Sequence, residues 1–191
     1  MGKMRRNRIA MTDAELKLAK PLVLVGMMGA GKTVIGKRLA AKLMVPFTDV
    51  DLEIEKAAGC SIADFFQNYG EDAFRDGERR VIKRLLGGSV GILATGGGAF
   101  MDAGTRKEIS QSGISVWLKA DLETLWRRVS RRDTRPLLKT SNPKVTLEGL
   151  VNQRYPVYAE ADITVISTDG PPEEMVGQVL GAVRNYLKKE K

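Results

Sequence analysis

Short apolar runs alternate along this chain with longer segments in which apolar residues recur at helical spacing. The runs expected to form strands are 22–25, 46–51, 90–94, 114–118 and 163–166. The segments expected to form helices are 32–43, 61–68, 70–86, 102–110, 121–132, 150–158 and 171–187. Regular alternation of strand and helix is typical of a parallel sheet that is covered by helices on both faces. The pattern therefore predicts an α/β fold in three layers, with a mostly parallel five-stranded sheet at its centre.

A glycine-rich segment connects the first predicted strand to the first predicted helix. Residues 26–33 read GMMGAGKT and match the pattern GxxxxGK[ST] of the phosphate-binding P-loop. In this context, backbone N–H groups and the start of a helix surround an anionic phosphate. Lys32 would reach the β- and γ-phosphates, and the Thr33 hydroxyl would bind Mg²⁺. A chance glycine-rich turn is the alternative, but the flanking elements favour nucleotide binding.

Two carboxylates stand at the end of the second predicted strand. Asp49 and Asp51 are two positions apart, so on a strand both side chains would point to the same face. Ligands of open α/β sheets bind at the carboxyl ends of the strands. One carboxylate could hold Mg²⁺ through water while the other orients a substrate hydroxyl and accepts its proton. Two solvated loop acids are the alternative, which the neighbouring P-loop makes less favoured.

Glycines and arginines supply two further candidate groups. Glycines 96–98 follow a predicted buried strand, where they would expose backbone N–H groups to an anion, form a close contact with a ligand, or make a plain tight turn. Arginine binds carboxylate and phosphate through paired hydrogen bonds, and Arg75, Arg135 and Arg154 are candidates for that role. Spacing alone does not separate them from ordinary solvated surface arginines.

The composition narrows the chemistry. The chain contains no histidine and a single cysteine, Cys60, which excludes histidine bases, histidine metal ligands and an internal disulfide. Any metal would have oxygen ligands, which favours Mg²⁺. No apolar stretch approaches the roughly 20 residues that span a bilayer. We therefore expect a cytoplasmic protein with no membrane contact.

Length and charge bear on the organisation of the chain. A chain of 191 residues fits one domain, here 21–191, preceded by a basic extension of residues 1–20 that is disordered or forms a short helix. The polar segment 133–149, which contains two prolines, predicts a mobile loop or lid.

The formal net charge of +8 raises a nucleic-acid hypothesis. Residues 1–20 contain six Lys/Arg and two Asp/Glu, so half of that charge (+4) lies on the extension. The rest of the chain has no basic stripe interleaved with aromatic residues. We therefore expect no nucleic-acid partner, and a nucleotide-dependent nucleic-acid-binding module remains the weaker alternative from another class.

Taken together, the motifs resemble those of the shikimate kinase family. The matching blocks are residues 26–33, 47–51, 70–75 with Glu78, 95–99, 135–138 and 154–158. They occur in this order within a span of roughly 21–187, and as a set they are much more specific than the P-loop alone. The resemblance implies a P-loop kinase fold with a mobile lid at about 132–149 and a substrate-binding region at about 51–86. It also implies transfer of the γ-phosphoryl group of ATP to the 3-hydroxyl of shikimate, in aromatic amino acid biosynthesis.

The resemblance further implies roles for individual residues, in a monomer that binds ATP and shikimate. ATP would be bound by Gly29, Ala30, Gly31, Lys32, Thr33, Val34, Arg132 and Arg135. Shikimate would be bound by Asp51, Arg75, Gly97, Gly98 and Arg154, with Glu78 holding the arginines. Lys32, Asp51 as the base, and Arg135 would be catalytic. Thr33, and Asp49 through water, would bind one Mg²⁺. Arg132 would stack on adenine, with Arg131 and Arg128 as alternatives.

A second enzyme hypothesis remains within the same fold. Other small-molecule kinases and nucleoside monophosphate kinases share the P-loop and a lid. The paired acids Asp49 and Asp51, together with Arg75 and Arg154, favour a polyol carboxylate over a nucleotide base as the acceptor.

Overall fold

The centre of the protein is a parallel β-sheet. A computed structural model describes residues 16–131 and 140–189. Its five strands follow the order β2-β3-β1-β4-β5, and every neighbouring pair is parallel. Their bounds are β1 (Leu22–Val25), β2 (Phe47–Asp49), β3 (Ile92–Ala94), β4 (Ile114–Lys119) and β5 (Ile163–Ile166). The predicted α/β class and the five-stranded sheet are confirmed.

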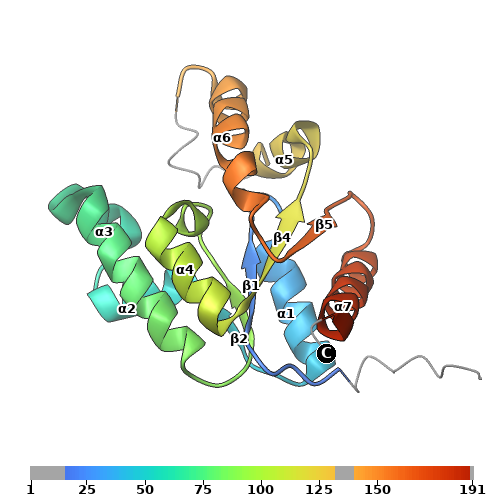
Figure 1. The fold of residues 1–191 in the computed structure, drawn as a ribbon. Coiled ribbons are helices and arrows are strands. Elements are labelled where there is room, and N and C mark those ends of the chain that lie inside the picture. Colours follow the sequence, from blue (N-terminus) through green and yellow to red (C-terminus); the bar gives the residue numbers. More distant parts are fainter. Residues whose placement is uncertain (1–15, 132–139, 190–191) are drawn as a thin grey trace, which may run out of the picture.

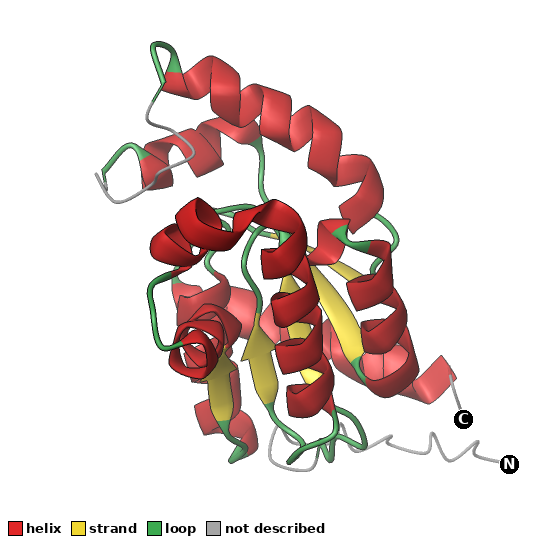
Figure 2. Cartoon of the chain, turned by 90° about the vertical axis from the view of Figure 1, so that its left-hand side faces the viewer, coloured by secondary structure: helices red, strands yellow, loops and turns green. Residues whose placement is uncertain are grey.

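Helices cover both faces of the sheet (Figures 1 and 2). Their bounds are α1 (Lys32–Leu43), α2 (Val50–Ala58), α3 (Ile62–Leu86), the short η2 (Ala99–Met101), α4 (Ala103–Ser112), α5 (Leu122–Val129), α6 (Pro143–Tyr158) and α7 (Pro172–Lys189). Helices α1 and α7 pack together on one side, whereas α2, α3 and α4 form the other side. Helices α5 and α6 lie together beyond the end of the sheet to which the strands point (Figure 1).

The burial of the strands follows from this layering. All four residues of the central strand β1 are fully buried, as expected for a strand with helices on both faces. The edge strand β5 alternates instead, with Ile163 and Val165 buried and the two residues between and after them exposed. Leu16 also joins the core, so the packed part of the chain begins a few residues before Pro21.

The second predicted strand is shorter than expected. It ends at Asp49, and the following residues form α2, which the pattern did not predict. Asp49 acts as the N-cap, because its Oδ1 accepts a hydrogen bond from the backbone N–H of Asp51 at 3.2 Å. Negative charge in the first turn of α2, from Asp51 and Glu53, further favours the helix start. The expectation that Asp49 and Asp51 share one face of a strand is therefore wrong.

The part of the predicted lid that the structure describes is mostly helical. Helix α6 begins at Pro143 rather than at residue 150. Proline is well suited to the first turn of a helix, where its missing N–H has no partner to lose, and Asn142 caps the helix by accepting from the N–H of Val145. Residues 143–149 are therefore not a loop, because this proline begins a helix instead of interrupting one.

Three other predicted helices differ in their limits. The segments 61–68 and 70–86 form one continuous run, α3, with a kink at Gly70, whose φ of 76° and ψ of 179° are not helical. The helix predicted for 121–132 ends at Val129, for which we find no local sequence signal.

Residues 1–15 and 132–139, which include Arg132 and Arg135, lie outside the described residues. Among the residues described, no helix is both long and apolar enough to cross a membrane.

A glycine in α1 provides a test of the packing between this helix and β2. A Cβ added to Gly36 would lie 2.6 Å from Cε2 of Phe47. Alanine favours a helix over glycine by about 1 kcal/mol, but overpacking of a core costs about 1–3 kcal/mol. We expect Gly36→Ala to lower the free energy of unfolding by about 1 kcal/mol in urea denaturation. Gly177→Ala in α7, where nothing lies within 4 Å, is the control and should stabilise the protein. Stabilisation by both variants would contradict the tight contact.

Candidate active site

A cleft of about 700 Å³ opens at the carboxyl ends of the strands. Its walls come from six places in the sequence: residues 28–35 after β1, Asp49 and Asp51 at the end of β2, residues 95–97 after β3, three arginines near the end of α5, residues 167–170 after β5, and the start of α7. This is the edge at which ligands of open α/β sheets bind. The cleft therefore brings together the P-loop, the acidic pair and the glycine run that the sequence indicated.

The P-loop has the backbone shape of an anion-binding turn. Gly31, the N-cap of α1, adopts a φ of 94°, and Gly29 has a φ of 81°, both in the region that favours glycine. A Cβ on Gly29 would also lie 2.8 Å from Cγ1 of Val129, so α5 packs directly on the loop. The ammonium group of Lys32 donates to the carbonyl oxygens of Gly26 at 2.7 Å and Met27 at 3.0 Å. The lysine thus lies folded over the loop to which it belongs.

Oxygen ligands suited to a hard cation lie at the start of α1. The Thr33 hydroxyl donates to Oδ2 of Asp49 at 3.2 Å, which places a hydroxyl beside a carboxylate. Within the described ranges, no group of three or more His, Cys, Asp or Glu side chains could hold a metal by itself. Mg²⁺ in kinase sites takes only one or two protein ligands and completes its shell with phosphate and water. The pair therefore fits Mg²⁺ that arrives with a nucleotide.

Each glycine of the run at 96–98 contacts a different functional side chain. A Cβ on Gly96 would lie 2.6 Å from Oδ1 of Asp51. A Cβ on Gly97 would lie 3.2 Å from Nη1 of Arg154, and one on Gly98 would lie 2.5 Å from Nη2 of Arg75. We name residues 95–98 the glycine loop. The absence of side chains at its three glycines lets a carboxylate and two guanidinium groups from three helices converge on one stretch of backbone.

A buried carboxylate fixes one of these arginines. Nη1 of Arg75 lies 2.6 Å from Oε2 of Glu78, and Glu78 is only 1% exposed. Burial raises the pKa of Glu78, partly offset by the charge and hydrogen bond of Arg75. Burial opposes the charge on Arg75 as well, but Glu78 and Glu71 more than compensate and raise its pKa. Arg75 is therefore held in its charged form and in one direction, as predicted for a residue that Glu78 orients.

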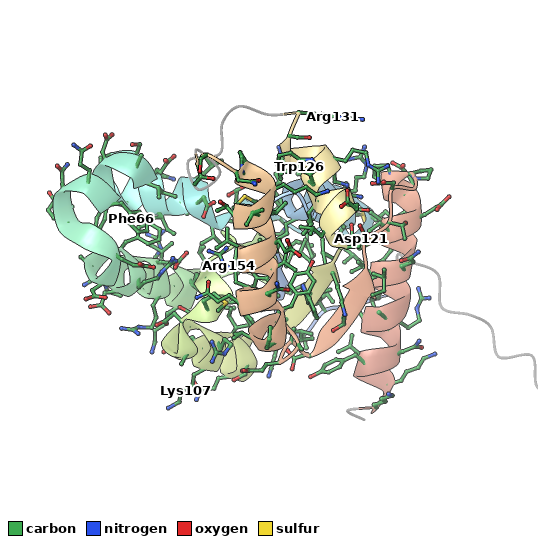
Figure 3. All side chains as sticks on the ribbon, turned by 90° about the horizontal axis from the view of Figure 1, so that it is seen from above. Phe66, Lys107, Asp121, Trp126, Arg131 and Arg154 are labelled. Atoms are coloured by element: carbon green, nitrogen blue, oxygen red, sulfur yellow. The ribbon has the colours of Figure 1, made fainter. Side chains whose placement is uncertain are left out.

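The second arginine of the glycine loop comes from α6. Seen along the strands, α6 lies between α3 and α5 and carries Arg154 (Figure 3). Nη1 of Arg154 donates to the carbonyl oxygen of Gly97 at 3.1 Å. Arg75 and Arg154, which are 79 positions apart in the sequence, thus reach adjacent glycines.

At the other end of the cleft, the arginines of α5 connect the P-loop to the segment after β5. Nη1 of Arg128 donates to the carbonyl oxygen of Gly29 at 3.1 Å and to Oγ of Ser167 at 3.0 Å. Asp169 pairs with both Arg127 and Arg128. Arg131 lies exposed at the outer end of the cleft (Figure 3). Ser167 and Asp169 follow the last strand, at the edge of the sheet where ligands bind.

Among the predicted site residues that are described, the structure gathers two groups. One contains Lys32 and Thr33 of the P-loop with Asp49, and the other contains Asp51, Arg75, Arg154 and the glycine loop. Arg132 and Arg135 lie outside the described residues. Their assignments therefore stay predictions.

Comparison with known proteins agrees with this arrangement. The family model described as "Shikimate kinase" matches residues 28–184. A shikimate kinase from Rhizobium leguminosarum bv. trifolii is 54% identical over 171 residues, which are 90% of this chain and 87% of the relative. A shikimate kinase from Paramagnetospirillum magneticum is 53% identical over 175 residues, 92% of this chain and 90% of the relative.

A solved structure gives the same result. The shikimate kinase from Acinetobacter baumannii in complex with shikimate superposes with a TM-score of 0.82 at 37% sequence identity, over 87% of this chain and 93% of that one. The family expected from the sequence motifs is confirmed. The chain belongs to the shikimate kinase family.

Proposed function

We propose that the two ends of the cleft hold ATP and shikimate, so that the γ-phosphoryl group passes to the 3-hydroxyl of shikimate. Membership of the family makes the chain a phosphotransferase that phosphorylates shikimate in aromatic amino acid biosynthesis. The assignment of individual residues is the proposed part. One observation carries it: Asp51, Arg75 and Arg154 meet at the glycine loop, and Asp51, Gly96 and Gly97 also line the cleft that contains the P-loop.

The nucleotide half is assigned to the P-loop and the end of α5. The backbone of residues 29–34 surrounds the phosphates, and Lys32 leaves the carbonyls of its own loop to reach the β- and γ-phosphates. Arg128 has its N–H edge engaged by the P-loop and Ser167, which leaves its flat face to stack on adenine. We therefore favour Arg128 over Arg132 for this contact. Arg135, outside the described residues, keeps its proposed role beside the transferring group.

Thr33 and, through water, Asp49 are the residues proposed to hold one Mg²⁺. Bound together with ATP, the ion would neutralise charge on the β- and γ-phosphate oxygens. Asp49 can serve this purpose because its carboxylate also caps α2, which fixes it beside the Thr33 hydroxyl.

The acceptor half is assigned to the residues around the glycine loop. Arg75 and Arg154 bind the carboxylate of shikimate, with the backbone of Gly97 and Gly98 between them. Asp51 lies against Gly96 on the side that faces the P-loop cleft, where it accepts the proton of the 3-hydroxyl as that oxygen attacks phosphorus. The arginines make the site selective for a carboxylate-bearing acceptor.

The charges in the cleft fit phosphoryl transfer. Negative charge spreads over the transferring group in the transition state, and catalysis consists mostly of positioning and countercharge. Lys32, the P-loop amides and Arg135 supply the countercharge in this proposal. Helix α6 lies beyond the end of the sheet to which the strands point (Figure 1).

We further propose that residues 21–191 act as one domain and as a monomer in the cytoplasm, without nucleic-acid or membrane partners. Several basic side chains on the body have acidic partners, such as Lys83 with Glu108 and Arg84 with Glu53. Such pairing leaves less free positive surface for a polyanion.

The first test measures ADP release with ATP and Mg²⁺, with and without shikimate. We expect turnover that depends on shikimate and that falls at least about 100-fold in Lys32→Ala, because the β- and γ-phosphates lose their cation. Lys37→Ala, on the exposed side of α1, is the control and should keep normal turnover. Binding of ATP without stimulation by shikimate would point instead to another hydroxy acid or a nucleoside monophosphate as the acceptor.

The role of Asp51 as the base is tested by Asp51→Asn, which keeps the shape of the side chain against Gly96. We expect kcat to fall by about 100-fold or more, with the KM for ATP within twofold, because only proton acceptance is removed. Glu53→Gln, in the same turn of α2 but paired with Arg84, serves as the control. An unchanged kcat in Asp51→Asn would exclude this carboxylate as the base.

The role of Arg75 is tested by comparing the KM values for the two substrates. We expect Arg75→Ala to raise the KM for shikimate about 10- to 100-fold, the loss of a charged hydrogen bond of about 1.5–3 kcal/mol. The KM for ATP should stay within twofold. Arg79→Ala removes an arginine one turn further along α3, which pairs with Asp76 and Asp102, and should change neither value. An equal loss of affinity for ATP in Arg75→Ala would contradict the assignment.

A further inference from the structure

One backbone carbonyl in the glycine loop is held by two side chains of the same helix. The oxygen of Gly97 accepts a hydrogen bond from Arg154 and a second one from the hydroxyl of Tyr158. The two side chains lie four positions apart on α6, which places them one above the other on one face of the helix. Tyr158 is not one of the residues proposed above to bind ATP or shikimate.

The surroundings of Tyr158 leave its hydroxyl little freedom. The residue is fully buried, and its ring packs near Phe100 and Trp117, at centroid distances of 6.4 and 5.9 Å. The hydroxyl lies 4.0 Å from the sulfur of Met27, a P-loop residue whose carbonyl oxygen accepts from Lys32. Tyr158 thus stands where α6, the glycine loop and the P-loop meet.

The protonation state of Tyr158 suits a permanent donor. Burial raises its pKa to about 12, against the opposing effect of the neighbouring Arg154. The hydroxyl therefore keeps its proton at neutral pH. A buried hydroxyl without a partner costs free energy, so the bond to Gly97 is maintained as long as α6 and the glycine loop stay in place.

We propose that Tyr158 is a positioning residue for the acceptor site, which fixes the carbonyl of Gly97 and with it the guanidinium of Arg154. The proposal rests on the proposed function, in which Gly97 and Arg154 bind the carboxylate of shikimate. Tyr158 itself does not touch the substrate. Its contribution is to hold two substrate-binding groups in register.

The physical basis is the rigidity of the peptide unit. The carbonyl of Gly97 and the N–H of Gly98 belong to one planar trans peptide, so fixing the oxygen also fixes the direction of that N–H. Glycine is otherwise the residue with the greatest backbone freedom, and this loop contains three in a row. A donor from a packed helix therefore supplies the order that the glycines lack, and Arg154 reaches the same oxygen only if that oxygen stays in place.

The test is Tyr158→Phe, which keeps the ring and removes the hydroxyl. Loss of one hydrogen bond should raise the KM for shikimate about threefold to tenfold while the KM for ATP stays within twofold. The matched control is Tyr155→Phe, because Tyr155 lies on the same helix, has a pKa also raised by burial to about 12, and donates to a carbonyl outside the glycine loop, that of Ala120. It should leave both KM values within twofold.

The readouts separate positioning from a general loss of stability. ADP titration of the same preparations gives the fraction of protein with a folded nucleotide site, and kcat is calculated per folded site. The melting temperature should fall by a similar amount in the two tyrosine variants. Equal KM values for shikimate in Tyr158→Phe and Tyr155→Phe, or a parallel rise of both substrates' KM values in Tyr158→Phe, would overturn the proposal. Absence of shikimate-dependent turnover in the parent protein would instead overturn the proposed function.

A double variant tests whether Tyr158 and Arg154 act together. If both side chains act on the same carbonyl, Tyr158→Phe should raise the KM for shikimate by a smaller factor in an Arg154→Lys background than in the parent protein. Equal factors in the two backgrounds would mean that the side chains act independently, which contradicts the shared role.

Discussion

The candidate active site depends on the close approach of side chains to the backbone at residues 96–98. Asp51, Arg154 and Arg75 come from three different helices, and each has an atom within 3.2 Å of the place that a Cβ on one of these glycines would take. Side chains at positions 96 and 98 would displace the Asp51 carboxylate and the Arg75 guanidinium, and one at position 97 would crowd Arg154. The sheet order places this loop beside the P-loop, because β3, which precedes the glycine loop, is the direct neighbour of β1.

Charge creates the second constraint, since two guanidinium groups and several carboxylates share a small volume. Glu78 is buried and ionic, and its pKa is raised by burial even with Arg75 at 2.6 Å. Such a pair contributes little net stability, because desolvation of the two ions offsets their attraction. The pair instead fixes the position of Arg75, whose guanidinium group lies against Gly98.

The two ends of the cleft are built by different means. The nucleotide end consists of one local motif supported by packing, in which α5 contacts Gly29 and Arg128 connects the P-loop to Ser167. The acceptor end has no local motif, and its parts are separated by about half the length of the chain. Helix α6 contributes to both ends through its last turns, since Arg154 and Tyr158 reach the glycine loop and the Tyr158 hydroxyl also lies near Met27.

The sequence by itself determined the elements whose signals are local. The P-loop, β1, α1 and β5 occur where the apolar pattern and glycine spacing indicated, because each depends on neighbours within a few residues. The set of motifs also determined the family. The apolar pattern did not reveal α2, because a three-residue strand that ends in a helix-capping aspartate resembles a longer strand. The pattern also did not reveal the early start of α6, where Pro143 begins a helix instead of breaking one. Only the tertiary structure decided which glycine each charged side chain contacts, and that Tyr158 shares the Gly97 carbonyl with Arg154. These contacts join residues tens of positions apart, and no local preference of the chain encodes them, because they arise when the parallel strands bring their carboxyl ends to one edge.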